Sequence, residues 1–219
     1  MRKQLIRTLL AAGTTAAALT LAVPAAMAAG TWTVTGGPSF TSAAATGTTF
    51  TLSDTTSGLS FTCTVGASVG TVTVQNGSTN TAIGHVTSSS FGSSAHKCNG
   101  PLGSTGTSTQ TSGTTATLNA VSFASGVTTG TITGVDHTLT ISSFLGTCTA
   151  RVKGTAGTKY NNSSHLLQFT TTNDNLKVVS TSGSCSGIIK TNDVVTFSSG
   201  SGGETVTGSP TPSIQVSQP

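Results

Sequence analysis

Charged side chains are scarce in this sequence. Lysine, arginine, aspartate and glutamate make up 6% of the 219 residues, whereas they make up about 25% of a typical soluble domain. This scarcity argues against a coiled coil, a charge-rich disordered tail and a nucleic-acid-binding protein, because each of these depends on many ionised side chains. In place of charges, the chain carries 47 threonines, 31 serines and 27 glycines.

Residues suited to catalysis or to glycan stacking are also few. The acidic residues are scattered and never form a close pair, so a glycosidase-like pair of carboxylates has no local support. Glycan sites commonly use aromatic side chains as stacking platforms, and this chain has only one Trp and one Tyr. Trp32 is a weak candidate for a binding residue, and the favoured interpretation is that it anchors the first strand. The acidic residues are Asp54, Asp136, Asp174, Asp193 and Glu204, and the phenylalanines expected in the core are Phe50, Phe61, Phe91, Phe123, Phe144, Phe169 and Phe197.

The first 28 residues have the pattern of a secretory signal peptide. Three basic residues lie within the first seven positions, an apolar run follows, and small residues precede an expected cleavage after Ala28. Residues 29–219 contain no second apolar stretch of about 20 residues, so no membrane span is expected after cleavage. Cleavage would leave six basic and five acidic side chains, a net charge of +1, and no basic patch for phosphates or anionic lipid. We expect a secreted, extracellular protein.

Four cysteines in an exported chain predict two disulfides, because exported proteins meet an oxidising environment. Three pairings are open. The spacing favours Cys63–Cys98 and Cys148–Cys185, since the two loops then have similar sizes of 35 and 37 residues. A metal site at His96 and Cys98 is the alternative, but no second ligand pair lies nearby. We predict neither a metal nor another cofactor.

A two-residue alternation recurs along the chain. Stretches such as 31–35, 129–133 and 137–141 place apolar residues on one side and mainly threonines on the other, as half-buried strands do. Turn clusters separate these stretches, and no stretch after the first 30 residues keeps a helical period for three turns. The sequence therefore predicts an all-β fold, an antiparallel β-sandwich or jelly roll.

We expect one sandwich domain over residues 29–219. Residues 103–115 consist almost entirely of Gly, Ser and Thr and are expected to form a flexible surface loop. The alternative is a linker between two smaller lobes, each of which would have little apolar area for a core of its own.

One string, Gly66-Ala67-Ser68-Val69-Gly70, matches the nucleophile-elbow formula of hydrolases. That motif carries chemistry only on a tight strand-to-helix turn above a parallel sheet, which the pattern does not predict. Composition alone yields about 0.5 such match in a chain this rich in Gly and Ser. We interpret the string as a glycine-flanked hairpin turn, and a hydrolase would require a histidine and an acid to converge on Ser68.

Asp136 and His137 are the one adjacent acid–histidine pair in the sequence. Neighbouring residues of a strand point to opposite faces, so the two cannot act together, and we expect them in the turn before strand 137–141 with Asp136 bonded to local backbone amides. His85, His96 and His165 lack ligand spacing and are expected at the surface or on edge strands. We predict no catalytic residue and no enzymatic activity.

Five short sequence segments are similar to segments of known proteins: residues 83–87, 98–103, 148–154, 160–162 and 183–189. Through them the chain resembles a group of small exported actinobacterial proteins that share a signal peptide, a Trp-containing first strand and two disulfides. The order Cys98, Gly100-Pro101, Gly103 is more distantly similar to exported proteins named activators of alkane oxidation, which associate with biofilm or surface phenotypes. The resemblance implies no catalysis.

The outward faces of the expected strands carry mostly Thr, Ser and Gly, so little protects their edges from pairing with another chain. A terminal strand, 31–35 or 213–217, is expected to add to a neighbour's sheet. We therefore predict a secreted structural or surface-associated protein that contacts itself, as an oligomer or fibre, or cell-surface material, and not nucleic acid. The alternative is an extracellular binding module for a glycan or an apolar ligand, which an exposed aromatic patch or a closed apolar pocket between the sheets would favour.

Overall fold

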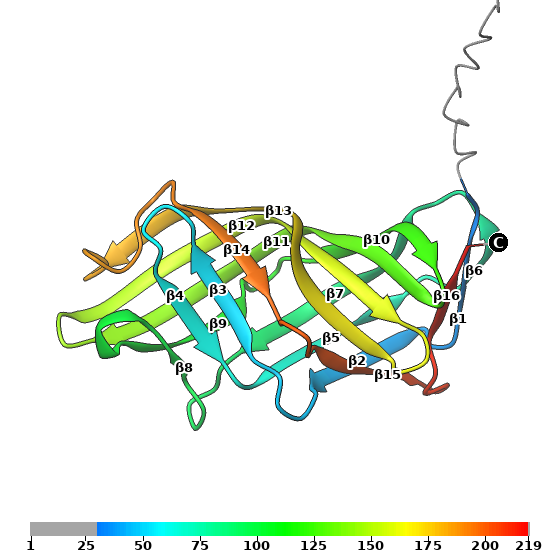
Figure 1. Ribbon diagram of the computed structural model, residues 1–219, viewed down its shortest axis with the longest axis horizontal. Helices are drawn as coiled ribbons and strands as arrows, with labels where there is room; N and C mark the ends of the chain where they lie inside the picture. The colour runs from blue at the N-terminus through cyan, green and yellow to red at the C-terminus, as the bar shows by residue number, and fades with distance from the viewer. Residues whose placement is uncertain (1–29, 219) are drawn as a thin grey trace, which may run out of the picture.

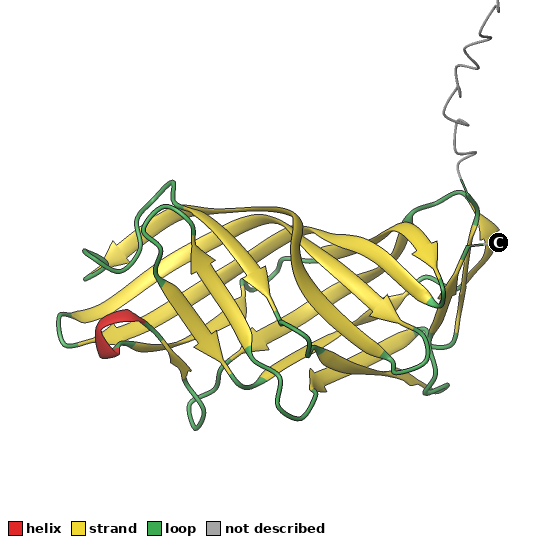
Figure 2. Ribbon diagram, in the orientation of Figure 1, coloured by secondary structure: helices red, strands yellow, loops and turns green. Residues whose placement is uncertain are grey.

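A computed structural model describes residues 30–218, and the expected signal peptide, residues 1–28, lies outside the described residues (Figure 1). The described chain is an all-β antiparallel sandwich, as the alternation predicts. Buried and exposed residues alternate regularly in β5 (Gly66–Val72) and β15 (Glu204–Ser209). The one helical element in this range is a short 3-10 turn, η1 (Pro101–Gly103), drawn red in Figure 2.

The main sheet has 13 strands, and extra pairings join its layers into two closed lobes. The terminal lobe lies next to the small sheet that holds both ends of the described chain, and the hairpin lobe lies at the other end of the molecule (Figure 1). In order of pairing, the terminal lobe comprises β10 (Ala116–Ala124), β11 (Val127–Ser143), β12 (Gly146–Asn161), β13 (Leu166–Gly183), β15, β2 (Ser39–Ala44), β5 and β7 (Ala82–Phe91). The hairpin lobe comprises β11, β12, β13, β14 (Val194–Ser198), β3 (Phe50–Asp54), β4 (Ser60–Cys63), β8 (Cys98–Asn99) and β9 (Thr105–Gln110).

Three long strands, β11, β12 and β13, belong to both lobes. Their pairing register shifts near the middle, between Thr133 and Val135 on β11 and between Thr155 and Gly157 on β12. Such bulges bend a strand and re-aim its side chains. Gly154 lies at this bend with φ +140°, and a Cβ there would overlap the carbonyl oxygen of Asn175. The bend divides each long strand between the two lobes.

Some segments expected outside strands lie within them. Residues 105–110 of the expected loop 103–115 form β9, which pairs with β11, β7 and β8. Backbone hydrogen bonds to these neighbours fix β9 although its sequence has no apolar alternation. Asp136 and His137 lie inside β11 and not in a turn, because the bulge at Gly134 lets the strand continue past the expected break.

The edges of the sheets are largely occupied. Every strand of the 13-stranded sheet has a paired neighbour on each side. In the small sheet, β1 (Trp32–Thr35) lies between β16 (Gln215–Ser217) and β6 (Gln75–Ser78), so β1 offers no free edge. The Asn162 amide covers Val216 of β16 by donating to its carbonyl at 2.7 Å and accepting from its N–H at 3.0 Å. The expected addition of 31–35 or 213–217 to another sheet therefore lacks the open edge that it needs.

Both predicted disulfides, Cys63–Cys98 and Cys148–Cys185, are present. Cys63 lies on β4 and Cys98 on β8, while Cys148 lies on β12 and Cys185 follows β13. Both bridges therefore cross-link the hairpin lobe, and the pairing predicted from loop size is confirmed.

Two clusters of buried side chains fill the interior, one mainly in the terminal lobe and one in the hairpin lobe. Trp32 is 1% exposed and belongs to the first cluster, so it anchors β1 and presents no binding surface. Phe144 was expected in the core but is 80% exposed, because it occupies the tip of the β11–β12 hairpin. Phe50, Phe91, Phe169 and Phe197 pack on one another with centroid distances of 4.7 to 6.1 Å.

Candidate functional site

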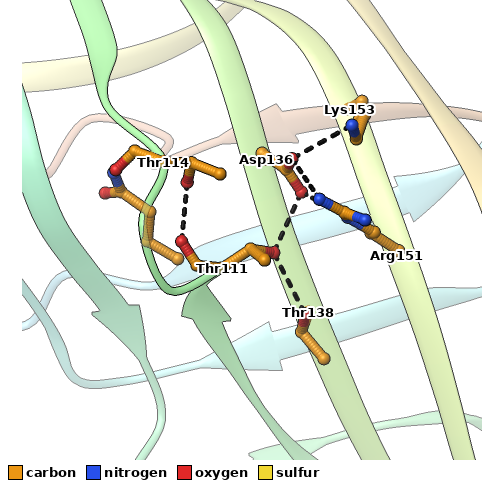
Figure 3. A network of polar contacts seen from close by, with 7 residues as sticks. Thr111, Thr114, Asp136, Thr138, Arg151 and Lys153 are labelled. Carbon is orange, nitrogen blue, oxygen red and sulfur yellow. Dashed lines mark hydrogen bonds and ion pairs between the residues drawn. The ribbon is translucent and has the colours of Figure 1, made fainter.

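Asp136 points away from the interior and forms the centre of a polar cluster on the outer face of β11 (Figure 3). Its carboxylate accepts hydrogen bonds from Arg151 Nε and Nη2, both at 2.7 Å, and Lys153 Nζ lies 3.2 Å away. The hydroxyl of Thr111 donates to the same carboxylate at 2.9 Å. These contacts, led by the hydrogen bonds from Arg151, lower the pKa of Asp136 to about 2.

His137 points to the opposite face of β11, into the interior, as the alternation along a strand requires. Its Nε2 lies 2.8 Å from Ser89 Oγ on β7, and its Nδ1 lies 2.9 Å from Ser108 Oγ on β9. Strands β7 and β9 pair with each other at Phe91 and Ser108, where the two lobes meet. The meeting of these strands therefore places a serine on each side of the imidazole.

The surrounding hydrogen bonds assign the tautomer of His137. Gln110 donates through Nε2 to the carbonyl oxygens of Val86 at 3.2 Å and Thr114 at 2.8 Å, which leaves its Oε1 to accept from the Ser89 hydroxyl at 3.1 Å. Since Ser89 has only one hydrogen, His137 Nε2 must carry a proton and donate to Ser89. Nδ1 is then the acceptor, and Ser108 donates to it.

Burial keeps this imidazole neutral. Desolvation lowers the pKa of His137 to about 4, and the nearby negative charge of Asp136 only partly opposes that effect. The lone pair of the neutral ring faces Ser108 and not Ser89 in the assigned tautomer. The arrangement thus offers hydroxyl groups held in fixed orientations and gives Ser89 no general base.

An interior cavity with a volume of about 80 Å³ lies beside His137. None of the residues that line it is exposed, and they come from both core clusters, so it occupies the junction of the lobes. Its wall is mostly hydrocarbon, including Phe91, Leu139 and Ile141. The polar side chains on this wall are few, and Ser89, Ser108, Gln110 and His137 form one connected group among them.

Ser68, the serine of the elbow-like string, also lines the cavity, but it lies within strand β5 and not at a turn. The expectation of a hairpin turn at 66–70 is therefore wrong. The pairing register aligns Ser68 with Ser89 of β7 and with Ser42 of β2. In the described part of the chain no histidine makes a hydrogen bond to Ser68, so the convergence that a hydrolase would require is missing there.

A fully buried carboxyl lies behind this serine. Glu204 is 0% exposed, and burial raises its pKa. The Ser42 hydroxyl donates to Glu204 Oε2 at 2.6 Å, and its oxygen also lies 3.3 Å from the Ser68 carbonyl oxygen. Hydrogen bonds from the Ser42 and Ser68 hydroxyls favour the ionised carboxyl but only partly oppose the effect of burial on its pKa.

The other histidines lie away from the cavity. His85 contacts Thr117 Oγ1 at 3.3 Å, His165 contacts the Tyr160 hydroxyl at 3.3 Å, and His96 is exposed. Between residues 30 and 218, no group of three or more His, Cys, Asp and Glu side chains is placed to hold a metal ion. The same residues contain no helix long and apolar enough to cross a membrane.

Sequence reasoning missed the polar group at the cavity. His137 shares its parity with Leu139 and Ile141, so the alternation could have placed it on the inner face of the strand. Its partners carry no such signal, because Ser89 is one of many serines and Ser108 falls in a stretch without apolar alternation. Comparison of the chain with family models, curated proteins and solved structures found no match.

Proposed function

We propose that this protein is a secreted, non-catalytic binding protein that holds a small, mainly apolar molecule in the cavity between its lobes. The observation that carries the proposal is the cavity itself, an apolar interior space with one connected group of hydrogen-bonding side chains on its wall. Binding sites for small molecules commonly combine a hydrocarbon wall with a few oriented polar groups. The signal-like segment 1–28 and the two disulfides support secretion.

The size of the cavity limits the ligand. A water-sized probe needs about 10–15 Å³, so a cavity of about 80 Å³ has room for roughly six water-sized groups. The ligand is therefore a compact molecule or one arm of a larger molecule. A glycan, which has a polar group on nearly every carbon, does not suit this wall.

Binding is tested by NMR titration of the isotope-labelled protein with 1-pentanol. We expect saturable shifts of amide signals from lining residues, and a weakening of about tenfold or more in Ala156→Val, because the added methyl groups fill the cavity that Ala156 lines. Ala150→Val is the matched control, since Ala150 is buried on the same strand but does not line the cavity. Equal binding by both variants, or no saturable shift in the wild type, would refute the proposal.

A surface-associated role remains a second candidate, favoured by an apolar cluster at the end of the hairpin lobe. Phe144 and Leu145 form the hairpin tip, and Leu102 of η1 is also exposed. Because Ser142 of β11 pairs with Thr105, η1 lies near this tip (Figure 2). This cluster would contact apolar cell-surface material such as lipid. Binding to lipid vesicles by the wild type, but not by the double variant Phe144→Ser/Leu145→Ser, would support this role. If both proteins stay in solution to the same extent when vesicles are added, the role is refuted.

A further inference from the structure

We propose that the cavity selects an uncharged ligand that donates a hydrogen bond, namely a small apolar alcohol or phenol whose hydroxyl group donates to Ser108 Oγ. This inference rests on the proposed function and specifies the ligand class of the same site. It follows from two properties of the wall: which charges face the cavity, and which lone pairs and hydrogens the wall leaves unused.

Among the residues that the structure describes, no compensating charge faces the cavity. None of the described residues that line it is a lysine or an arginine. Asp136 is the one acidic residue among them, and its carboxylate points outward to Arg151 and Lys153, which neutralise it on the outer face. Burying an ion without a partner costs far more than burying a neutral polar group. An ionised carboxylate or ammonium ligand would meet that cost in full.

Around His137 the polar wall mainly offers acceptors, and the Ser68 hydroxyl, elsewhere on the wall, is engaged with Glu204. The Ser108 hydrogen is used on His137 Nδ1, and the Ser89 hydrogen is used on Gln110 Oε1. Both Gln110 amide hydrogens are used on backbone carbonyls, and the proton on His137 Nε2 is used on Ser89. Ser108 Oγ has no other partner among the described residues and therefore keeps its lone pairs free to accept. A ligand hydroxyl can satisfy them, whereas a ketone oxygen would face another acceptor.

Hydrocarbon packing completes the match. Phe91 lies beside the imidazole with a centroid distance of 5.9 Å, and Leu139 and Ile141 follow His137 on the inner face of β11. A ligand hydroxyl at Ser108 would therefore leave its hydrocarbon part against these side chains. Water molecules in the same place would lack some of their hydrogen bonds, because most of this wall is hydrocarbon.

The test compares three probes with six non-hydrogen atoms each, 1-pentanol, 2-pentanone and butyrate, titrated at pH 7 and followed by NMR. One neutral hydrogen bond corresponds to a preference of about 3-fold to 10-fold for the alcohol over the ketone. Butyrate, which is ionised at this pH, should bind about 100-fold more weakly than the alcohol or not at all. Ser108→Ala should abolish the preference for the alcohol over the ketone, and Ser90→Ala, at an outward-facing serine of β7, should retain it.

The outcomes separate the two proposals. If butyrate or the ketone binds as tightly as 1-pentanol to the wild type, the ligand class proposed here is wrong while the binding function stands. If none of the three probes shifts the signals of lining residues, the proposed function itself fails. The wild-type comparison decides between these results even where Ser108→Ala does not fold.

Discussion

His137 makes the stability of the fold depend on pH in a way that one substitution can isolate. In the folded protein its pKa is lowered to about 4, whereas the ordinary value is 6.5. As the pH falls below 6.5, the unfolded chain binds a proton at this site before the folded chain does. The free energy of unfolding that His137 contributes is therefore fully present above pH 6.5 and decreases until the pH reaches about 4, below which this group contributes no further change.

The magnitude follows from the two pKa values. Their difference converts to about 3 kcal/mol of unfolding free energy lost between pH 6.5 and 4. This is a large fraction of the roughly 5–15 kcal/mol by which small domains are stable. Glu204 and Asp174 act in the opposite direction, because burial raises the pKa of each and the folded state then binds their protons first. The pH profile of the wild type alone therefore mixes these effects.

Urea unfolding of the wild type and of His137→Gln, at several pH values from 7 to 4, separates them. Glutamine keeps hydrogen-bonding atoms in the cavity wall but does not titrate, while Glu204 and Asp174 remain in both proteins. We expect the wild type to lose about 3 kcal/mol relative to the variant as the pH falls from 7 to 4. Parallel pH profiles of the two proteins would show that the imidazole is not held neutral and would refute the tautomer assigned here.

Three further substitutions probe the frame around the site. Asp136→Asn should lower the unfolding free energy at pH 7 by about 1 kcal/mol. Since the pKa of Asp136 is lowered from 3.8 to about 2, the stability that its carboxylate contributes is present above pH 3.8 and disappears as the pH falls toward 2. Urea unfolding near pH 2 should therefore give the wild type and the variant the same unfolding free energy. Gly154→Ala should destabilise by about 2 kcal/mol or more in thermal unfolding, whereas Gly47→Ala, also at positive φ but with open space around a Cβ, should cost clearly less; equal losses would refute the close approach. Replacing the Cys148–Cys185 bridge by two serines should lower the unfolding free energy by about 3–4 kcal/mol for a loop of this size, and addition of reductant to the wild type should reproduce part of that loss.

The strands of this fold were largely predictable because their evidence is local. Alternation in 137–141 reflects which side chains face the core, and that pattern is set by the pleat of a single strand. The disulfide pairing was predictable because loop size distinguishes the three choices. That stretches 129–133 and 137–141 form one continuous strand was not predictable in the same way. In the sequence Gly134 resembles a turn residue, whereas in the structure it forms a bulge within the strand.

The site was much less predictable because it depends on pairing between distant segments. Ser89 and Ser108 meet His137 only because β7 pairs with β9 at the junction of the lobes, and no local pattern encodes that register. The stretch containing Ser108 lacks alternation because β9 is held by hydrogen bonds to neighbouring strands and carries few apolar side chains. Composition thus identified a loop where the backbone forms a strand.

The scarcity of large side chains provides a physical reason for the cavity. Two lobes of eight strands each must be filled by side chains that point inward, and at their junction several of those positions hold Ser or Ala, among them Ser68, Ser89 and Ala156. Small side chains leave space that the bent strands β11 to β13 cannot close without breaking their pairing. The hydroxyl-rich composition that argues against an aromatic glycan site therefore gives the interior both its unfilled volume and its hydrogen-bonding groups. A neutral wall follows from the same composition, because a chain with so few charges places its ion pairs on the outer face and its uncharged serines within.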